Sequence, residues 1–226
     1  MRRDALLAVV FAAGFAGITA ALAAGGWLIE LDLAVAEWAN GHRPAALAAI
    51  ARILNRLGQG GALLGISVVL AVWLGRVRWR RGEGRRRAWQ PPLYVLIAAV
   101  LVVPTVLLIK WVTERGAPSA PLPLEQTVQL MGPLPPGVYA AGYPGGHAVN
   151  TIVWYGVLLL LATRLLDAYG RPGPPRWLRL AIRIAPPVIV TAVTAYLTFH
   201  WLTDSLAGLL LGLSFDRILA LVRRLE

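Results

Sequence analysis

Six apolar stretches, each long enough to cross a lipid bilayer as a helix, divide this chain of 226 residues. They cover residues 6–28, 60–74, 93–112, 149–166, 184–201 and 202–222. A helix satisfies all its backbone polar groups inside a bilayer, so the stretches predict an all-α fold with six transmembrane helices. The composition agrees, because 58% of the residues are hydrophobic, 15% are charged, and the mean hydropathy is +0.64. We therefore predict a polytopic membrane protein with a single six-span domain over residues 1–226.

Basic residues are distributed unevenly between the two ends of these stretches. The formal net charge is +11, and 17 of the 22 Lys and Arg residues fall on one side of the predicted membrane. The other five are Arg43, Arg52, Arg56, Lys110 and Arg115. By the positive-inside rule, this asymmetry predicts a multi-pass protein of the cell membrane with both termini in the cytoplasm. Since topology explains the basic residues, the lipid bilayer is the expected environment and nucleic acid is not an expected partner.

Two segments near the N-terminus have alternative interpretations. Arg2 and Arg3, followed by an apolar run, resemble a secretory signal peptide. The run is too long for that, and its removal would leave an odd number of crossings, so we predict that the first span is retained. Residues 43–56 alternate apolar residues with arginines at helical spacing, which predicts a helix lying in the outer interface. An ordinary connecting helix is the alternative.

Four ionisable side chains are predicted to meet at one level of the membrane. They are Lys110, His147, His200 and Asp204. If odd-numbered spans run outward and even-numbered spans inward, all four lie at the extracytoplasmic ends of their spans. Ionisable groups beside hydrocarbon cost several kcal/mol each, so they are functional candidates. Their convergence from distant parts of the chain predicts a site on the extracytoplasmic side.

The connection at residues 113–146 is long and contains seven prolines, which is typical of a lid or a binding loop. We predict an extracytoplasmic loop that contributes to the active site. It leads into Gly145, Gly146 and His147, where small residues let backbone amides approach a ligand at the start of a helix. The helix dipole favours an anion there. The alternative is that the two glycines only permit a tight turn.

His200 and Asp204 are four residues apart, so they share a face if the helix continues through them. The carboxylate can then accept a hydrogen bond from one ring nitrogen and leave the other free as a nucleophile or base. A satisfied polar contact is the alternative, but the membrane setting and the second histidine favour catalysis. His42 is remote in sequence and lacks a ligand-like pattern around it, so we expect no metal site and no other cofactor.

Three stretches resemble the signature motifs of the type 2 phosphatidic acid phosphatase superfamily of membrane enzymes. They begin at Lys110, at Tyr143 in Tyr-Pro-Gly-Gly-His, and at Tyr196 in the segment that ends at Gly208. The resemblance implies that His200 is a nucleophile that forms a phosphohistidine, and that Asp204 orients it. It also implies that His147 protonates the leaving alkoxide. Candidate ligands of the substrate phosphate are Lys110, Arg115, Gly145, Gly146 and Thr194.

The motifs depart from the family pattern where arginines would hold phosphate. Ala117 stands at the position of the first-motif arginine, Gly145 replaces a serine, and Val193 with Thr194 replaces Ser-Arg. The catalytic set is retained while the phosphate ligands are fewer. The sequence therefore predicts a hydrolase that acts on phosphoric ester or anhydride bonds of a membrane lipid phosphate or diphosphate at the outer leaflet. A phosphotransferase is an open variant, and the alternative is a noncatalytic lipid-binding or lipid-transporting protein.

Overall fold

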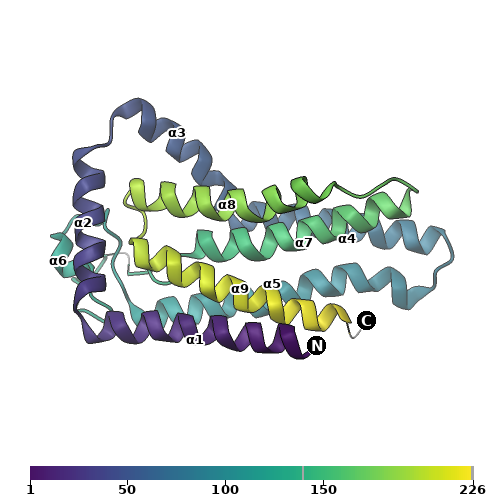
Figure 1. Cartoon of the computed structure of the whole chain (residues 1–226), viewed down its shortest axis with the longest axis horizontal. Helices are drawn as coiled ribbons and strands as arrows, with labels where there is room; N and C mark the ends of the chain where they lie inside the picture. Colours follow the sequence, from purple (N-terminus) through teal and green to yellow (C-terminus); the bar gives the residue numbers. More distant parts are fainter. Residues whose placement is uncertain (139, 225–226) are drawn as a thin grey trace.

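The computed structural model describes residues 1–138 and 140–224, and these form helices joined by turns and loops, without a strand (Figure 1). The helices are α1 (Arg2–Ala24), α2 (Trp27–Gly41), α3 (Ala45–Asn55), the 3₁₀ turn η1 (Arg56–Gly58), α4 (Gly60–Arg80), α5 (Arg85–Thr113), α6 (Leu124–Thr127), α7 (Gly146–Ala168), α8 (Arg176–Tyr196) and α9 (Leu202–Arg224). Within the described residues, six helices are long and apolar enough to cross a membrane: α1, α4, α5, α7, α8 and α9. The predicted all-α, six-span fold is confirmed.

The six spanning helices run side by side along the long axis of the molecule, and α2 lies across one end of the bundle (Figure 1). From α2 the chain returns through α3, which packs against α8. Helix α9 packs against α1 and α7, and α7 also contacts α4 and α8. Helices α7 and α9 are therefore central, and both begin at the end that α2 covers.

Glycines allow α7 and α9 to approach closely. A Cβ atom on Gly208 would lie 2.5 Å from the carbonyl oxygen of Gly145, and one on Gly212 would lie 3.0 Å from Cβ of Ile152. This spacing of small residues is typical of helix contacts in membranes. The Gly145 amide also donates a hydrogen bond of 2.8 Å to the carbonyl oxygen of Asp204. The start of α7 is thus fixed against the start of α9.

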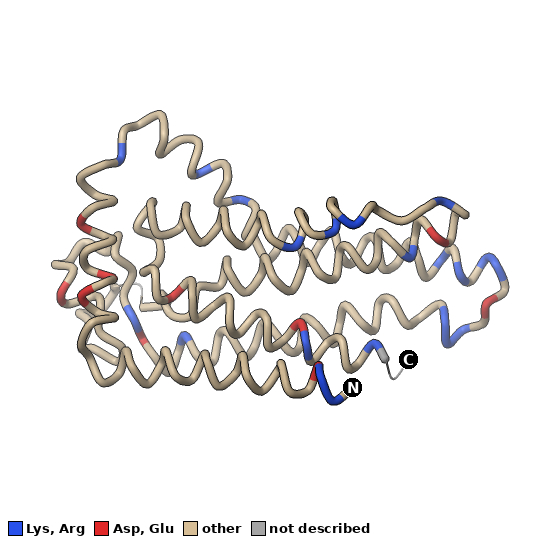
Figure 2. Tube along the Cα trace, in the orientation of Figure 1, with Lys and Arg blue, Asp and Glu red and all other residues tan. Residues whose placement is uncertain are grey.

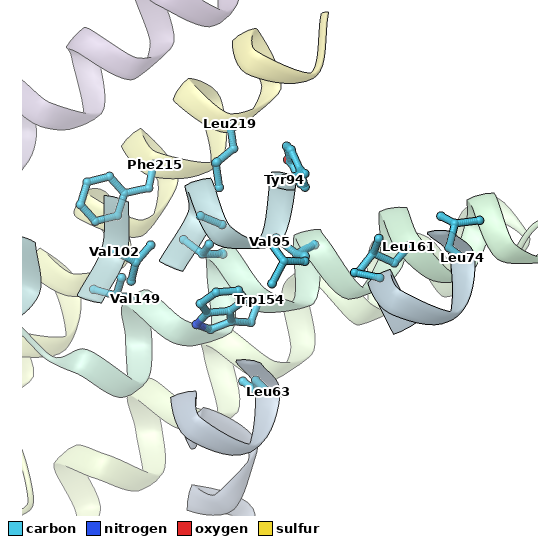
Figure 3. Close-up of a cluster of buried hydrophobic side chains, with 14 of the residues drawn as sticks. Leu63, Leu74, Tyr94, Val95, Val102, Val149, Trp154, Leu161, Phe215 and Leu219 are labelled. Carbon is cyan, nitrogen blue, oxygen red and sulfur yellow. The ribbon is translucent and has the colours of Figure 1, made fainter. Parts of the chain in front are cut away.

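The apolar core lies between α4, α5, α7 and α9, and Figure 3 shows its side chains spread along these helices, with Trp154 near the middle of the view. Trp154 is 1% exposed, and Val102 and Phe215 are buried beside it in the same cluster. In contrast, Val100 and Leu107 on α5 are 63% and 59% exposed. Apolar side chains that face outward along a spanning helix are accommodated by lipid, which fits the predicted membrane location.

The first and the fifth predicted spans have wrong boundaries. The first span ends at Ala24 because Gly25 and Gly26 take positive φ angles of 78° and 100° there, and α2 follows as a separate helix that the sequence analysis missed. The fifth span covers Arg176–Tyr196, so it begins and ends earlier than predicted. The helix predicted near residues 43–56 is present as α3 and η1, and its interfacial position stays a prediction.

Basic and acidic residues lie toward opposite ends of the bundle. Figure 2 shows most Lys and Arg positions toward the end that carries the two termini, and a group of acidic positions around the end covered by α2. This matches the distribution read from the sequence. The orientation of the bundle in the membrane stays a prediction.

Candidate active site

The structure brings together the two predicted catalytic histidines. His147 is the second residue of α7, and His200 lies in the turn between α8 and α9. Their ring centroids are 6.1 Å apart, with the planes at 60°. The side chain of Lys110, in the last turn of α5, lies beside the start of α7, because the Cε atom of Lys110 would be 3.8 Å from a Cβ atom on Gly146. Three ionisable groups from distant parts of the chain therefore meet at the end of the bundle under α2.

His200 is not part of a helix, contrary to the prediction that it ends the fifth span. Helix α8 closes with a Schellman motif, in which the Phe199 amide donates to the Thr194 carbonyl at 2.9 Å and the Thr198 amide to the Ala195 carbonyl at 3.0 Å. Thr198 has a φ of 57°, the left-handed conformation that this motif requires. A β-branched residue adopts it at a cost on the order of 1–2 kcal/mol. The turn directs His200 toward His147 and away from the axis of α8.

The His200 ring has one nitrogen committed and one free. Its Nδ1 lies 2.8 Å from the carbonyl oxygen of Gly142. Because a carbonyl oxygen only accepts, Nδ1 carries the hydrogen and donates it, and the lone pair remains on Nε2. The Oδ2 atom of Asp204 is 3.6 Å from the same Nδ1, which is too long for a hydrogen bond but close enough for the carboxylate charge to act on the ring. Gly142 therefore orients the ring, and Asp204 adds a negative charge beside it.

Asp204 is fully buried at the start of α9. Its Oδ2 accepts a hydrogen bond of 3.0 Å from the amide of Trp201, so the carboxylate reaches back to the helix N-cap. Its Oδ1 accepts a bond of 2.6 Å from Nη1 of Arg115. These bonds hold the carboxylate in one position, and the positive end of the helix dipole favours its charge.

Arg115 is also fully buried, and each of its side-chain nitrogens donates to the protein. Nε donates to the Val128 carbonyl at 2.7 Å, Nη1 donates to Asp204 and to Thr203 Oγ1, and Nη2 donates to Asp32 Oδ2 at 2.7 Å. The structure therefore places this predicted phosphate ligand behind Asp204, where it connects two buried carboxylates.

Asp32 of α2 completes this network, and the sequence analysis did not identify it. Its Oδ1 accepts a hydrogen bond of 2.9 Å from the amide of Thr203, which gives the second residue of α9 a partner from another helix. Its side chain is 1% exposed. Burial raises the pKa of Asp32, and the positive charge of Arg115 opposes that shift. Asp32, in the sequence Glu-Leu-Asp-Leu, could have been singled out as a candidate site residue, because few other charges interrupt the apolar N-terminal region.

The remaining predicted phosphate ligands occupy different positions. The Lys110 ammonium donates to the Ala141 carbonyl, beside the two histidines. The Gly145 amide is occupied by Asp204, as described above, whereas the Gly146 and His147 amides form no backbone hydrogen bond within the described residues. Free amides at a helix start are suited to an anion. Thr194 is 1% exposed and donates to the Val190 carbonyl at 2.7 Å, so it supports α8 from inside the bundle.

Tyr143 anchors the segment that precedes α7. Its side chain is fully buried, its ring stacks on Phe15 with centroids 5.8 Å apart, and its hydroxyl shares a hydrogen bond of 2.6 Å with Thr19. Burial raises the pKa of Tyr143 to about 12, although the hydrogen bond with Thr19 opposes the shift. The phenol therefore stays neutral at physiological pH and ties the motif to α1.

Two further residues near the histidines come from the segment predicted as an interfacial helix. Nδ2 of Asn55 lies 3.5 Å from Nε2 of His147. Nη1 of Arg43 donates to Thr198 Oγ1 at 2.9 Å and so braces the turn that carries His200. The ring of His42, in contrast, is exposed and stacks on Trp38, with centroids 5.3 Å apart.

A cavity of about 390 Å³ opens beside Lys110, between α4, α5 and α7. Apart from Lys110 and Asn150, its lining is apolar or glycine. It extends from Gly146 past Gly61 to Leu107, whose side chain is 59% exposed on the outer face of α5. The site therefore communicates with the membrane-facing surface through an apolar groove.

Comparison with known proteins agrees with the observed fold. The model of the PAP2 superfamily matches residues 88–225, which include Lys110, His147, His200 and Asp204 but not Asp32. The crystal structure of the first transmembrane PAP2 type phosphatidylglycerolphosphate phosphatase from Bacillus subtilis has the same fold, with a TM-score of 0.68. The two chains are 20% identical, over 100% of this chain and 98% of that one. No curated protein sequence matches the chain. Since the family model covers more than half of the residues and the fold agrees, this chain belongs to the PAP2 superfamily.

Proposed function

We propose that this protein is a membrane lipid phosphatase that transfers the phosphoryl group of a lipid phosphate to His200 and then to water. The proposal depends on one observation. The ring of His200 has a free Nε2 and lies beside Lys110, and its centroid is 6.1 Å from the centroid of the His147 ring. Membership of the PAP2 superfamily supports phosphatase chemistry. The structural relative is a phosphatidylglycerolphosphate phosphatase, and that class of substrate is a reasonable first candidate here.

In the first step, the lone pair on Nε2 of His200 attacks phosphorus while the bond from phosphorus to the lipid oxygen breaks. Protonated His147 donates its proton to that oxygen, so the lipid leaves as an alcohol. The two rings are close enough to contact one phosphoryl group, since a reacting nitrogen needs to approach phosphorus to about 3 Å. As Nε2 acquires positive charge, the nearby carboxylate of Asp204 stabilises the ring.

In the second step, His147 has lost its proton and acts as the base. It takes a proton from water, the hydroxide oxygen attacks phosphorus, and the phosphorus–nitrogen bond to His200 breaks. Lys110 and the amides of Gly146 and His147 stabilise the charge on the phosphoryl oxygens, as phosphoryl transfer requires. Arg115 acts as a positioning residue in this scheme, because it holds Asp204 and does not face the phosphate.

The apolar groove beside Lys110 supports a lipid substrate. A hydrocarbon chain in the groove stays out of water while its phosphate reaches the histidines. A soluble phosphate ester would need no such groove. The predicted topology, with the basic residues at the opposite end of the bundle, supports an active site that faces the extracytoplasmic side.

Filling the groove should reduce activity on long-chain lipids selectively. Gly61 lines the cavity, and a Cβ atom there meets nothing within 4 Å, so the side chain of Gly61→Leu starts in open space beside the cavity. Displacing about two methylene groups of a bound chain costs roughly 1.6 kcal/mol, or about tenfold in kcat/KM. Phosphate release from long-chain and short-chain phosphatidic acid measures the effect, and the short-chain rate should change by less than about twofold.

Gly65→Leu is the matched control, because Gly65 is equally open, lies one turn along α4 and does not line the cavity. It should behave as the wild type. An equal loss on both chain lengths, or the same loss in the control, would remove the argument for a chain-binding groove.

Replacing His147 should slow the enzyme according to the leaving group. In His147→Gln the lipid alkoxide has no proton donor, so phosphoenzyme formation should fall by roughly 10²- to 10⁴-fold. Nitrophenolate leaves without a proton, so its initial burst from p-nitrophenyl phosphate should fall by less than about tenfold. Stopped-flow measurement of the burst compares the two. Equal losses with both substrates would assign His147 to binding and not to proton transfer.

Transfer to an alcohol is a second candidate reaction, and the position of Arg115 favours testing it. With Arg115 committed to two carboxylates, the cations that remain near the histidines among the described residues are Lys110 and Arg43, and Arg43 donates to the turn that carries His200. A singly charged phosphodiester needs fewer cations than a phosphate monoester. With a diester, attack by His200 releases one alcohol and leaves the phosphatidyl group on Nε2, and an acceptor alcohol, in place of water, then takes that group from His200. Assays of purified protein with phosphatidic acid, phosphatidylglycerolphosphate and a polyprenyl diphosphate, with and without glycerol, separate hydrolysis from transfer.

A further inference from the structure

A second cavity lies at the opposite end of the bundle, between α7, α8 and the last turn of α9. Its volume is about 380 Å³. Four arginines line it: Arg176, Arg179 and Arg183 from α8, and Arg223 from α9. The proposed catalytic mechanism uses none of them, and the distance along the helices separates this cavity from the histidines.

Much of the positive charge in this cavity has no ion-pair partner among the described residues. Arg176, Arg179 and Arg183 follow an i, i+3, i+7 spacing, so they share one face of α8. Arg183 pairs with Asp216, with Nη1 and Oδ1 3.1 Å apart. The other three arginines have no ion pair within the part of the chain that the structure describes. Arg176 and Arg179 are exposed, which leaves both guanidinium groups available to a ligand.

The rest of the cavity is largely apolar. Leu159 and Leu160 of α7 and Leu180 of α8 line it, and Leu180 is 50% exposed toward the outer face. Trp177, between two of the arginines, is 69% exposed. Exposed tryptophans at the ends of spanning helices lie at the level of lipid headgroups. The cavity therefore combines cations at headgroup depth with apolar surface where an acyl chain begins.

From this combination we propose that the cavity binds one anionic glycerophospholipid of the leaflet at the arginine-rich end. Arg176, Arg179 and Arg223 contact the phosphodiester, for which the planar guanidinium is well suited because it donates two parallel hydrogen bonds. An acyl chain lies along Leu180. Basic pockets between spanning helices are a known form of headgroup recognition. The site is independent of the proposed phosphatase function.

The positive-inside rule alone would also explain arginines at this end, but it makes a different prediction about lipid binding. Positive-inside signals require only charge near the membrane and no cavity, so they imply no saturable preference among lipids. A bound anionic lipid implies one preferred site, selectivity for anionic over zwitterionic headgroups, and dependence on these particular arginines.

Native mass spectrometry of the detergent-solubilised full chain tests the proposal, with phosphatidylglycerol and phosphatidylcholine titrated separately. The wild type should retain one phosphatidylglycerol at least about tenfold more tightly than phosphatidylcholine. Arg176→Gln/Arg179→Gln should lose most of that preference. Arg171→Gln is the matched control, because it removes an exposed arginine of the same connection that does not line the cavity, and it should bind as the wild type.

A charge-preserving variant covers the case in which the glutamine variant fails to insert. Arg176→Lys/Arg179→Lys keeps both topology signals but cannot form the two parallel hydrogen bonds, so it should bind phosphatidylglycerol severalfold more weakly. Equal retention of the two lipids by the wild type, or unchanged binding in both double variants, would overturn the proposal. Displacement of the lipid by millimolar inorganic phosphate would instead identify a free-anion site and would also overturn the lipid assignment.

Discussion

His200→Asn should abolish turnover on every lipid phosphate that the wild type hydrolyses, while the helical bundle stays folded. Asparagine can still donate a hydrogen bond to the Gly142 carbonyl, so the turn between α8 and α9 keeps its contact. It has no nitrogen lone pair that can attack phosphorus. Loss of a nucleophile that acts with a partner group costs roughly 10⁴-fold or more in kcat.

The measurement is phosphate release by purified protein in mixed micelles, with thermal unfolding as the check on folding. His42→Asn is the matched control, since the His42 ring is exposed and stacks on Trp38. It should retain wild-type activity. Residual activity in His200→Asn above a few per cent would exclude His200 as the nucleophile. A wild type that is inactive on all lipids and in transfer assays would favour the noncatalytic lipid-binding alternative.

Arg115→Gln should be among the most destabilising single substitutions in the chain. It removes the counter-charge of Asp32 and Asp204, which are 1% and 0% exposed. An uncompensated buried charge costs about 3–5 kcal/mol, which corresponds to a fall in Tm of roughly 10 °C for a chain of this length. Activity should be lost at the same time, because Asp204 loses the contact that holds it beside His200.

Lys110→Gln provides the contrast for this prediction. Lys110 contacts a backbone carbonyl beside the histidines and pairs with no carboxylate in the described structure, so its loss should lower kcat/KM with a change in Tm of only a few degrees. Adding Asp32→Asn to Arg115→Gln removes one of the two orphaned carboxylates and should restore part of the lost stability. An Arg115→Gln protein with wild-type Tm and a raised KM would instead support the original prediction that Arg115 binds phosphate.

Much of the fold follows from the sequence, because a long apolar stretch has few alternatives in a bilayer. The exceptions are helix ends set by single residues. At the end of α8 the left-handed position of the Schellman motif is occupied by Thr198, where glycine is usual, so the residue that stops the helix resembles one that continues it. Arg43 supports this conformation through Thr198 Oγ1, a contact across 155 positions that no local pattern reveals.

In the candidate site, too, some positions could be predicted from the sequence and others could not. Lys110, His147 and His200 meet as predicted, because the alternation of spans places their helix ends on one side of the bundle. The position of Arg115 could not be predicted, since its partner Asp32 lies 83 positions earlier on a helix that the apolar pattern merged with other segments. From the sequence alone, an arginine at this position is interpreted as a phosphate ligand. Only the structure shows that buried carboxylates already pair with Arg115.

The network of Asp32, Arg115 and Asp204 links the covering helix α2 to the start of α9, next to the turn that carries His200. Asp32 also binds the amide and the hydroxyl of Thr203, so α2 holds the start of α9 by both charge and hydrogen bonds. The position of His200 therefore depends on a helix that lies outside the residues matched by the family model. We expect variants of α2 to affect activity although α2 carries none of the proposed phosphate ligands.

Trapping the phosphoenzyme tests the central claim most directly. Purified protein is mixed with lipid phosphate labelled with ³²P, quenched in alkali within milliseconds, digested and analysed by mass spectrometry. We predict an alkali-stable, acid-labile phosphate on His200, formed faster than phosphate is released and absent from His200→Asn. Steady-state phosphate release without label on any residue, or label that persists in His200→Asn, would contradict attack by His200.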